Sequence, residues 1–192
     1  MTVSKWMHVG TVLKMNAFNY PDKLGCQDKY KSFTFKEWNE RACRFANALA
    51  GAGAGYGERV AILAYNRVEW MEMYAGCAKG GQIAVPVMFR LAPVDIEYII
   101  NHSACKFFIV EKPFIESVNG IRDKLKTIPQ DNYIFLGEGK APDGYILSGE
   151  STFYFEIDSG EVKWLVKGTD KPSNWEEKTE KADGEKVDFE PA

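Results

Sequence analysis

A glycine-rich stretch is the first part of the chain whose residue types could bind a phosphate. Residues 51–57 read Gly-Ala-Gly-Ala-Gly-Tyr-Gly, and small residues let backbone N–H groups approach phosphate oxygens closely. In dinucleotide-binding proteins such glycines follow a strand and open a helix. Here the order is reversed, because a helical apolar pattern precedes the stretch and a strand pattern follows it. We therefore interpret residues 51–57 as a flexible connection from a helix to a strand.

The residue types that bind metals are few and scattered. The two histidines, His8 and His102, have no cluster of further ligands near them, and no C-x-x-C pair occurs. We therefore expect no metal site, and we expect His102 to cap carbonyl groups at a helix end rather than to act as an acid or base. Free, buried thiols of a reducing cytosol are the expected state of the four cysteines, Cys26, Cys43, Cys77 and Cys105.

Composition limits the class of protein. A length of 192 residues suits one domain of ordinary size, or one domain with an extension. Of the residues, 45% are hydrophobic, enough for a core, and 27% are charged. A net charge of −3 argues against nucleic acid or an anionic membrane as the main partner. No apolar run approaches the ~18–20 residues of a membrane span, and the N-terminus lacks the pattern of a signal peptide. We expect a cytoplasmic protein.

Residues 57–110 show strand and helix patterns in alternation. The run 59–64 is apolar with almost no alternation, as expected of a strand covered on both faces of a parallel sheet. Asn66, with Glu69 three residues later, predicts a capping box at the start of the next helix, and Gly80-Gly81 ends that helix. The pattern then predicts a strand over 83–87, a helix opened by Pro93 and a strand over 106–110. Such alternation favours right-handed βαβ crossovers.

The flanking segments complete the predicted fold, an α/β domain with a mostly parallel sheet, flanking helices and a C-terminal β-hairpin extension. Thr34 and Glu37 predict a second capping box, which opens a helix with an apolar stripe that includes Trp38 and Leu49. The other expected elements are a helix over 9–18, a hairpin of 23–27 with 31–35, a helix over 113–126, a strand over 132–136, a loop over 137–149, a hairpin of 153–157 with 162–166, and an extended or disordered tail over 169–192. We place the domain boundary between residues 149 and 150.

Several stretches, in this order, resemble the N-terminal part of the adenylate-forming acyl-CoA synthetases. They are YKSFTFKEWNERACRFANA (30–48), GERVAILAY (57–65), EWMEMYAGCAKG (69–80), VPVMFRLAP (85–93) and residues 96–110. The resemblance implies an ATP-dependent ligase that joins a fatty or other carboxylic acid to AMP and then to coenzyme A, with ATP, magnesium and coenzyme A as its cofactors. One departure is Met88, where members of the family often carry asparagine.

The resemblance also suggests a phosphate-binding loop. The family uses a loop rich in serine, threonine and glycine that ends Gly-Lys-Pro-Lys-Gly, and the nearest candidate here is Lys167-Gly168-Thr169-Asp170-Lys171-Pro172. Gly168, Thr169 and Lys171 are the candidate ATP-binding residues. The candidate has one glycine where the family has several, and Asp170 places a negative charge beside the phosphates. A degraded loop, a chance similarity and the hairpin interpretation of residues 162–166 therefore stay open.

The remaining segments of the family's machinery have no counterpart in these residues, so we assign no catalytic residue and expect the chain alone not to form acyl-CoA. Arg90, at the end of a strand, would face the nucleotide or coenzyme side, or would form an ion pair with Asp95 or Glu97. An alternative function is a non-catalytic interaction module that pairs with a partner chain or forms a homo-oligomer. A third possibility is that the tail after Leu147 covers the apolar surface that, in members of the family, contacts the rest of the synthetase.

Overall fold

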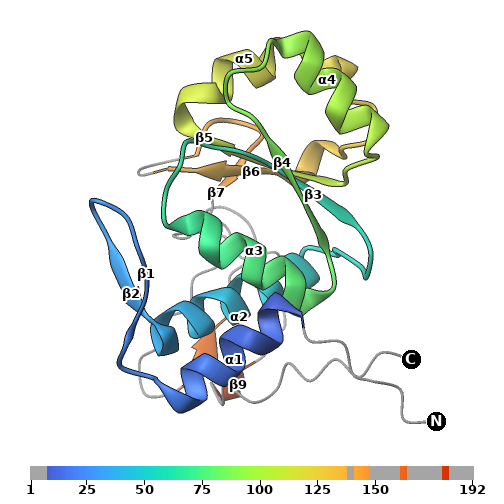
Figure 1. Ribbon diagram of the computed structural model, residues 1–192. Coiled ribbons are helices and arrows are strands. Elements are labelled where there is room, and N and C mark those ends of the chain that lie inside the picture. The colour runs from blue at the N-terminus through green and yellow to red at the C-terminus, as the bar shows by residue number, and fades with distance from the viewer. Residues whose placement is uncertain (1–7, 138–140, 148–160, 164–178, 182–192) are drawn as a thin grey trace, which may run out of the picture. The chain divides into compact units, whose positions relative to one another are not determined.

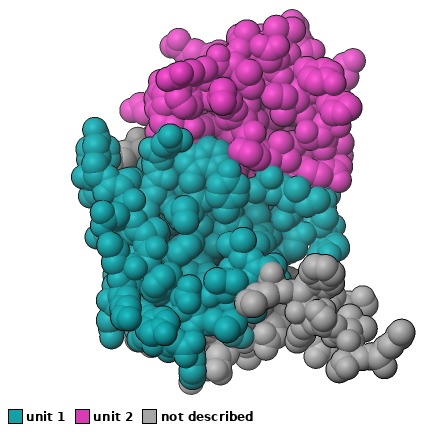
Figure 2. Space-filling view, in the orientation of Figure 1, with its two compact units in different colours: residues 1–58, 66–84, 187–192 teal, residues 59–65, 85–186 magenta. Residues whose placement is uncertain are grey.

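The computed structural model of the protein describes residues 8–137, 141–147, 161–163 and 179–181 (Figure 1). These residues belong to two compact units (Figure 2). Among the described residues, unit 1 contains 8–58 and 66–84, and unit 2 contains 59–65 together with those from 85 onward. Each unit is described by itself below. The predicted boundary at residues 149 and 150 stays a prediction.

Unit 1 consists of three helices and a hairpin. The helices are α1 (Val9–Asn19), α2 (Phe35–Gly51) and α3 (Glu69–Gly80), and the strands β1 (Leu24–Gln27) and β2 (Ser32–Thr34) pair antiparallel. The predicted capping box is confirmed: the backbone N–H of Glu37 donates to the Thr34 hydroxyl, and the Thr34 N–H donates to the Glu37 carboxylate. The three helices meet at a small apolar cluster of Leu13, Ala42 and Ala75, with Phe35 and Trp38 packed against it.

Helices α2 and α3 approach each other closely at Gly76, which is buried. A Cβ atom on Gly76 would lie 2.5 Å from Cδ1 of Phe45 and 3.0 Å from the carbonyl oxygen of Ala42. The missing side chain is therefore what lets the two helices pack at this distance.

We expect Gly76→Ala to destabilise unit 1 by about 1–3 kcal/mol, because the added methyl group forces the two helices apart. This cost exceeds the gain of about 1 kcal/mol that alanine brings to a helix interior. Urea denaturation followed by tryptophan fluorescence measures the change. Gly51→Ala is the control, since a Cβ there meets nothing within 4 Å. A Gly76→Ala protein as stable as the wild type would show that the helix contact is looser than described.

The start of α3 differs from the prediction. The helix begins at Glu69, its N-cap residue is Val68, and the N-cap has no side-chain hydrogen bond of its own. Instead Oδ2 of Asp28, in the turn of the β1–β2 hairpin, accepts a hydrogen bond of 2.9 Å from the Val68 N–H. Oδ1 of the same carboxylate accepts from the N–H groups of Tyr30 and Lys31. These backbone hydrogen bonds lower the pKa of Asp28. The predicted cap at Asn66 is therefore wrong, because a distant residue provides the acceptor.

Glu69, the first residue of α3, is not a capping partner but a buried carboxylate. Its Oε1 accepts from Nζ of Lys31 at 2.9 Å, and its Oε2 accepts from Nε of Arg67 at 2.7 Å. Burial alone would raise the pKa of this carboxyl, but the hydrogen bonds from Arg67 and Lys31 outweigh it and lower the pKa to about 2. The pair of cations therefore keeps Glu69 ionised.

The C-terminus of α3 and the glycine-rich stretch agree with the prediction. Gly81 follows α3 in the left-handed conformation with φ 76°, which favours glycine. Residues 51–57 connect α2 to the strand that begins at Arg59. The Gly57 N–H donates to the carbonyl of Gly81, and the buried Gln82 donates through Nε2 to the carbonyl of Ala54. The N–H of Gly57 and the carbonyl of Ala54, both in this connection, are therefore hydrogen-bonded to other residues of unit 1.

Unit 2 is built on a parallel sheet with the strand order β4-β3-β5-β6-β7. The strands are β3 (Arg59–Leu63), β4 (Ile83–Val87, whose first two residues are counted in unit 1), β5 (Phe107–Glu111), β6 (Tyr133–Leu136) and β7 (Ile146–Leu147). The pairs β3–β5, β5–β6 and β6–β7 are parallel. Pro86 lies in β4, at the edge of the sheet, where a missing N–H is tolerated. The predicted α/β fold with a mostly parallel sheet is confirmed.

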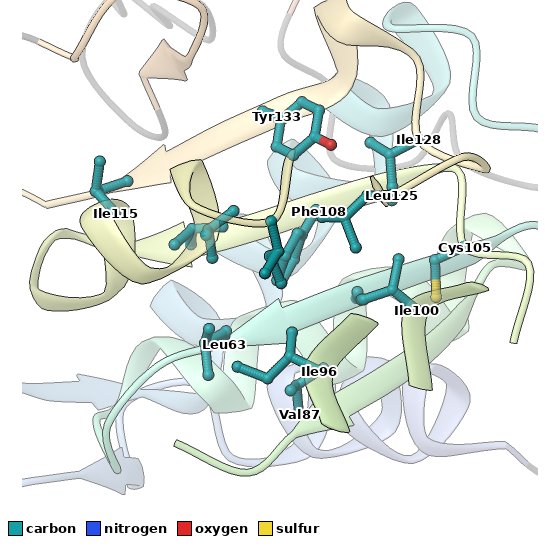
Figure 3. Close-up of a cluster of buried hydrophobic side chains, with 14 of the residues drawn as sticks. Leu63, Val87, Ile96, Ile100, Cys105, Phe108, Ile115, Leu125, Ile128 and Tyr133 are labelled. Carbon is teal, nitrogen blue, oxygen red and sulfur yellow. The ribbon is translucent and has the colours of Figure 1, made fainter. Parts of the chain in front are cut away.

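Helices α4 (Pro93–His102) and α5 (Ile115–Asn119) lie over one face of this sheet (Figure 1). Alternate residues of the strands point to that face, so Leu63, Phe108 and Tyr133 lie in one cluster with Ile96 and Ile100 of α4 (Figure 3). Phe108 is at its centre, with a relative exposure of 0%. This cluster is the core of unit 2.

Two segments after β5 differ from the prediction. In place of one helix over 113–126, the chain forms a 3-10 turn (Lys112–Phe114), the short α5 and a second 3-10 turn (Arg122–Lys124). Gly120 is the C-cap of α5, and its low helix propensity explains why α5 ends there. A third 3-10 turn, Gln130–Asn132, precedes β6.

The expected loop 137–149 contains strand β7, and Arg122 holds the segment before it. Nη2 of Arg122 donates to the carbonyls of Gln130 and Gly144, at 3.0 and 2.7 Å. The guanidinium also lies 3.8 Å from the centroid of the Tyr133 ring.

Further along the chain, β8 (Glu161–Lys163) pairs antiparallel with β9 (Thr179–Lys181). Strand β9 lies within residues 169–192, which were expected to be an extended or disordered tail. The partner strand that we predicted for β8, residues 153–157, lies outside the described residues.

The cysteines are free, as expected. Cys77 and Cys105 are buried, and burial raises the pKa of the Cys77 thiol to about 12 and that of Cys105 to about 11. Both therefore stay protonated and unreactive near neutral pH. Cys26 and Cys43 are only half-buried, which differs from the prediction.

Within the described ranges no helix is long and apolar enough to cross a membrane.

Candidate functional site

The candidate site is the edge of the unit 2 sheet at which its parallel strands end. Open α/β sheets bind ligands outside the carboxyl ends of their strands. Tyr65 follows β3, Phe89 and Arg90 follow β4, and Glu111 is the last residue of β5. Phe114 ends the 3-10 turn that comes next. The topology therefore brings residues from three separate loops to one edge.

Three aromatic side chains from these loops form a cluster, which we call the aromatic triad: Tyr65, Phe89 and Phe114. The Tyr65 ring lies 5.0 Å from that of Phe89 and 4.8 Å from that of Phe114, measured between centroids. The two phenylalanine rings are 6.5 Å apart. Phe89 and Phe114 are half-buried and pack against the core, whereas Tyr65 is 45% exposed. The triad therefore joins the core to a solvent-facing aromatic ring.

Arg90 is the cation of this edge. Its side chain is exposed, and its guanidinium lies 5.4 Å from the centroid of the Phe89 ring. None of the ion pairs among the described residues involves Arg90, so the predicted alternative of an ion pair with Asp95 or Glu97 is wrong. The guanidinium at the strand ends is an available donor for an anion.

Glu111 holds the backbone at the same edge. Its Oε2 accepts a hydrogen bond of 2.6 Å from the N–H of Tyr65. Tyr65 follows β3 and Glu111 ends β5, and these two strands are neighbours that pair as far as Leu63 and Val110. The charged carboxylate of Glu111 thus binds the N–H of Tyr65, just beyond the last residues that β3 and β5 pair.

The groups at this edge are suited to binding a ligand. Exposed aromatic rings suit a planar group, and the guanidinium suits a phosphate or carboxylate.

His102 lies away from this edge. It is the last residue of α4, which leads into the opposite, amino end of β5. Its ring stacks on Tyr98, at 5.2 Å between centroids, and among the described residues it donates no hydrogen bond to a carbonyl. The predicted capping role of His102 is therefore wrong. Among residues that the structure describes, no group of three or more His, Cys, Asp or Glu side chains could hold a metal ion.

The predicted ATP-binding residues Gly168, Thr169 and Lys171 lie outside the described residues, so they stay a prediction. Of the residues that the sequence singled out, the structure places Arg90 at the candidate site. Sequence reasoning missed Tyr65, Phe89, Glu111 and Phe114. A usable signal existed, because each of them ends or closely follows one of the apolar runs that were predicted as strands.

The fold is that of an open α/β sheet with helices on its face, and the carboxyl ends of the strands, where this class of sheet binds ligands, carry the aromatic triad and Arg90. The family profile described as "AMP-binding enzyme" matches residues 13–176. Because this match includes most of the chain, the protein belongs to the AMP-binding enzyme family, and the resemblance to adenylate-forming synthetases is confirmed.

Related sequences and solved structures include CoA ligases. The chain is 33% identical to the long-chain-fatty-acid–CoA ligase of Thermus thermophilus over 118 residues, which are 62% of this chain and 21% of the relative. It is 30% identical to 4-hydroxybutyrate–CoA ligase 2 of Metallosphaera sedula over 107 residues, 56% of this chain and 20% of that protein.

Among solved structures, the anthranilate CoA ligase AuaEII in complex with anthranoyl-AMP matches with a TM-score of 0.70 and 27% identity. This match covers 75% of our chain and 27% of AuaEII. The N-terminal domain of FACL13 from Mycobacterium tuberculosis matches with a TM-score of 0.65 and 29% identity, over 68% of our chain and 34% of that domain. The chain thus spans about a fifth of the length of its curated relatives, and its fold is found in adenylate-forming ligases.

Proposed function

We propose that this chain forms the N-terminal α/β part of an ATP-dependent acyl-CoA ligase. The ligase would join a carboxylic acid to AMP, with release of pyrophosphate, and then transfer the acyl group to coenzyme A. The observation that carries the proposal is the family match over residues 13–176, together with a parallel sheet that superposes on ligase structures. The alternative of a non-catalytic interaction module is not favoured, because the reported relatives are ligases.

Two groups of residues would contact the cofactors. Gly168, Thr169 and Lys171 would bind the phosphates of ATP, the glycine by close approach of backbone N–H groups and the lysine by its charge. Arg90 and the aromatic triad, at the carboxyl edge, would face the nucleotide or the coenzyme. Magnesium would arrive with ATP and reduce the negative charge of its phosphates. The described residues offer no cluster of ligands for a free metal ion, so we assign it no protein site.

The substrate class is a carboxylic acid. Relatives are named for long-chain fatty acids, 4-hydroxybutyrate and hydroxybenzoate, which share a carboxylate and differ in the rest of the molecule. The proposal therefore extends to the carboxylate and not to the acyl chain. The free cysteines and the need for ATP and coenzyme A support a cytoplasmic location.

ATP–pyrophosphate exchange tests the proposal, since it reports the adenylation step alone. We expect the purified chain to bind ATP and to exchange with at least one acid from a panel of short- to long-chain and aromatic acids. We expect no acyl-CoA from the same chain when coenzyme A is added. Exchange with none of the acids would contradict adenylation by this chain, and acyl-CoA formation would show that the chain is catalytically sufficient.

The phosphate-binding role of Lys171 has a test of its own. Lys171→Ala should weaken ATP binding by about 10- to 100-fold, the expected effect of losing a hydrogen bond from a charged group. Isothermal titration calorimetry measures the affinity. Lys126→Ala, which removes an exposed lysine of unit 2, is the matched control and should bind ATP as the wild type does. Equal affinities for the two variants would exclude Lys171 from the site.

A further inference from the structure

We infer that Glu111 is a positioning residue that fixes Tyr65 at the carboxyl edge of the unit 2 sheet. The inference rests on the proposed function, because it gives that edge a preorganised aromatic ring. It is carried by three observations: where Glu111 is anchored, what its carboxylate binds, and how the Tyr65 ring is held.

Glu111 is anchored by the sheet itself. It is the last residue of β5, and on the side away from β3 it is in register with Leu136 of β6. On the other side, the register of β3 with β5 ends with Leu63 opposite Val110. The backbone of Glu111 is thus held in the ladder at the point where β3 leaves it. Its side chain starts from a fixed position.

The carboxylate then reaches the chain that leaves β3. Oε2 of Glu111 accepts from the N–H of Tyr65 at 2.6 Å, two residues beyond the last paired residue of β3. A hydrogen bond from an N–H group to a carboxylate is stronger than one between neutral groups. It fixes the direction in which the chain turns after the strand, and therefore the Cα position from which the Tyr65 side chain extends.

The ring of Tyr65 contacts both other rings of the aromatic triad. It meets Phe89 at an interplanar angle of 63° and Phe114 at 57°, so the two phenylalanines present their rings to it from two loops. Both phenylalanines pack against the core of unit 2. The ring is nevertheless 45% exposed. A ring that is already ordered and still accessible loses little freedom when a planar ligand stacks on it.

The first test measures the Tyr65 amide directly. In Glu111→Ala the hydrogen exchange of this amide, followed by NMR, should become about 10- to 100-fold faster, because its charged acceptor is lost. Glu111→Gln keeps an oxygen acceptor and should restore most of the protection. Glu116→Ala, an exposed glutamate on α5, is the control. If the exchange in Glu111→Ala equals that of the wild type, Glu111 does not hold Tyr65.

The second test separates positioning from structure. ATP is the probe, titrated into the wild type and into the variants Glu111→Ala, Glu111→Gln and Tyr65→Ala. We expect Glu111→Ala and Tyr65→Ala to raise the dissociation constant by a similar factor of about 5–10, and Glu111→Gln to stay within about two-fold of the wild type, with circular dichroism showing that each variant is folded under the conditions of the titration. Unchanged ATP affinity in both alanine variants would overturn the inference.

The two proposals fail in different ways. A wild-type chain that binds no ATP would contradict the proposed function. In that case the hydrogen exchange of the Tyr65 amide still tests the positioning by Glu111. Exchange that is faster in Glu111→Ala than in the wild type supports it, and exchange at the wild-type rate overturns it.

Discussion

Replacement of Glu69 by alanine is expected to destabilise unit 1 by about 3–5 kcal/mol, one of the two largest effects of any single substitution proposed here. Glu69 is 5% exposed, and its carboxylate binds both Arg67 and Lys31. Its removal leaves the Arg67 guanidinium, whose side chain is only 23% exposed, without this partner. A cation that loses its acceptor in a region with little water cannot recover the lost interaction from solvent.

Urea denaturation followed by tryptophan fluorescence measures this loss, since Trp38 and Trp70 lie in unit 1. Glu40→Ala, at an exposed position of α2, is the matched control and should change the stability by less than about 0.5 kcal/mol. A Glu69→Ala protein within about 1 kcal/mol of the wild type would contradict the role of the buried carboxylate.

The pH dependence supplies a second readout of the same substitution. The folded-state pKa of Glu69, about 2, lies below its ordinary value of 4.5, so its contribution is complete above about pH 4.5 and is lost as the pH falls toward 2. The wild type should therefore lose more stability than Glu69→Gln between pH 5 and pH 2. Parallel curves would show that Glu69 is not the group that titrates.

The second large effect is expected for Phe108→Ala, at about 3–5 kcal/mol. Phe108 is fully buried on β5, in register with Tyr133 of β6, and its ring is 6.3 Å from that of Tyr133. Truncation to alanine removes the side chain at the centre of the core shown in Figure 3, where the β-strands on either side limit how far neighbours can move into the cavity.

Hydrogen exchange of the β5 and β6 amides, with urea denaturation followed by circular dichroism, measures the loss. Phe114→Ala is the comparison, because Phe114 is half-buried at the edge of the same cluster and should cost clearly less. If the two truncations cost the same, the centre of the core does not lie at Phe108.

Strands β3 to β6 of the unit 2 sheet could be predicted because each of them carries its own signal. Residues 60–64 and 107–110 are apolar without alternation, and the structure buries residues 60–63 and 107–110 completely or nearly so. The start of α2 could be predicted for the same reason, since Thr34 and Glu37 satisfy each other locally.

Features that depend on distant residues could not be predicted. The capping-box pattern at Asn66 was misleading, because the acceptor for the Val68 N–H is Asp28, 40 residues earlier. Strand β7 was missed because it has two residues, and the Arg122 hydrogen bond to Gly144 that precedes it spans 22 residues. The candidate site follows the same rule. Arg90 was recognised from its own strand, whereas the aromatic triad exists only because three loops meet at one edge.

The cap on α3 has a consequence for how the chain is made. During synthesis the hairpin that contains Asp28 leaves the ribosome before α3 does, so the acceptor for the Val68 N–H is already present when the helix forms. A peptide of residues 66–82 alone would lack that acceptor. The N-terminus of helix α3 therefore takes a hydrogen-bond acceptor from a segment that was translated earlier.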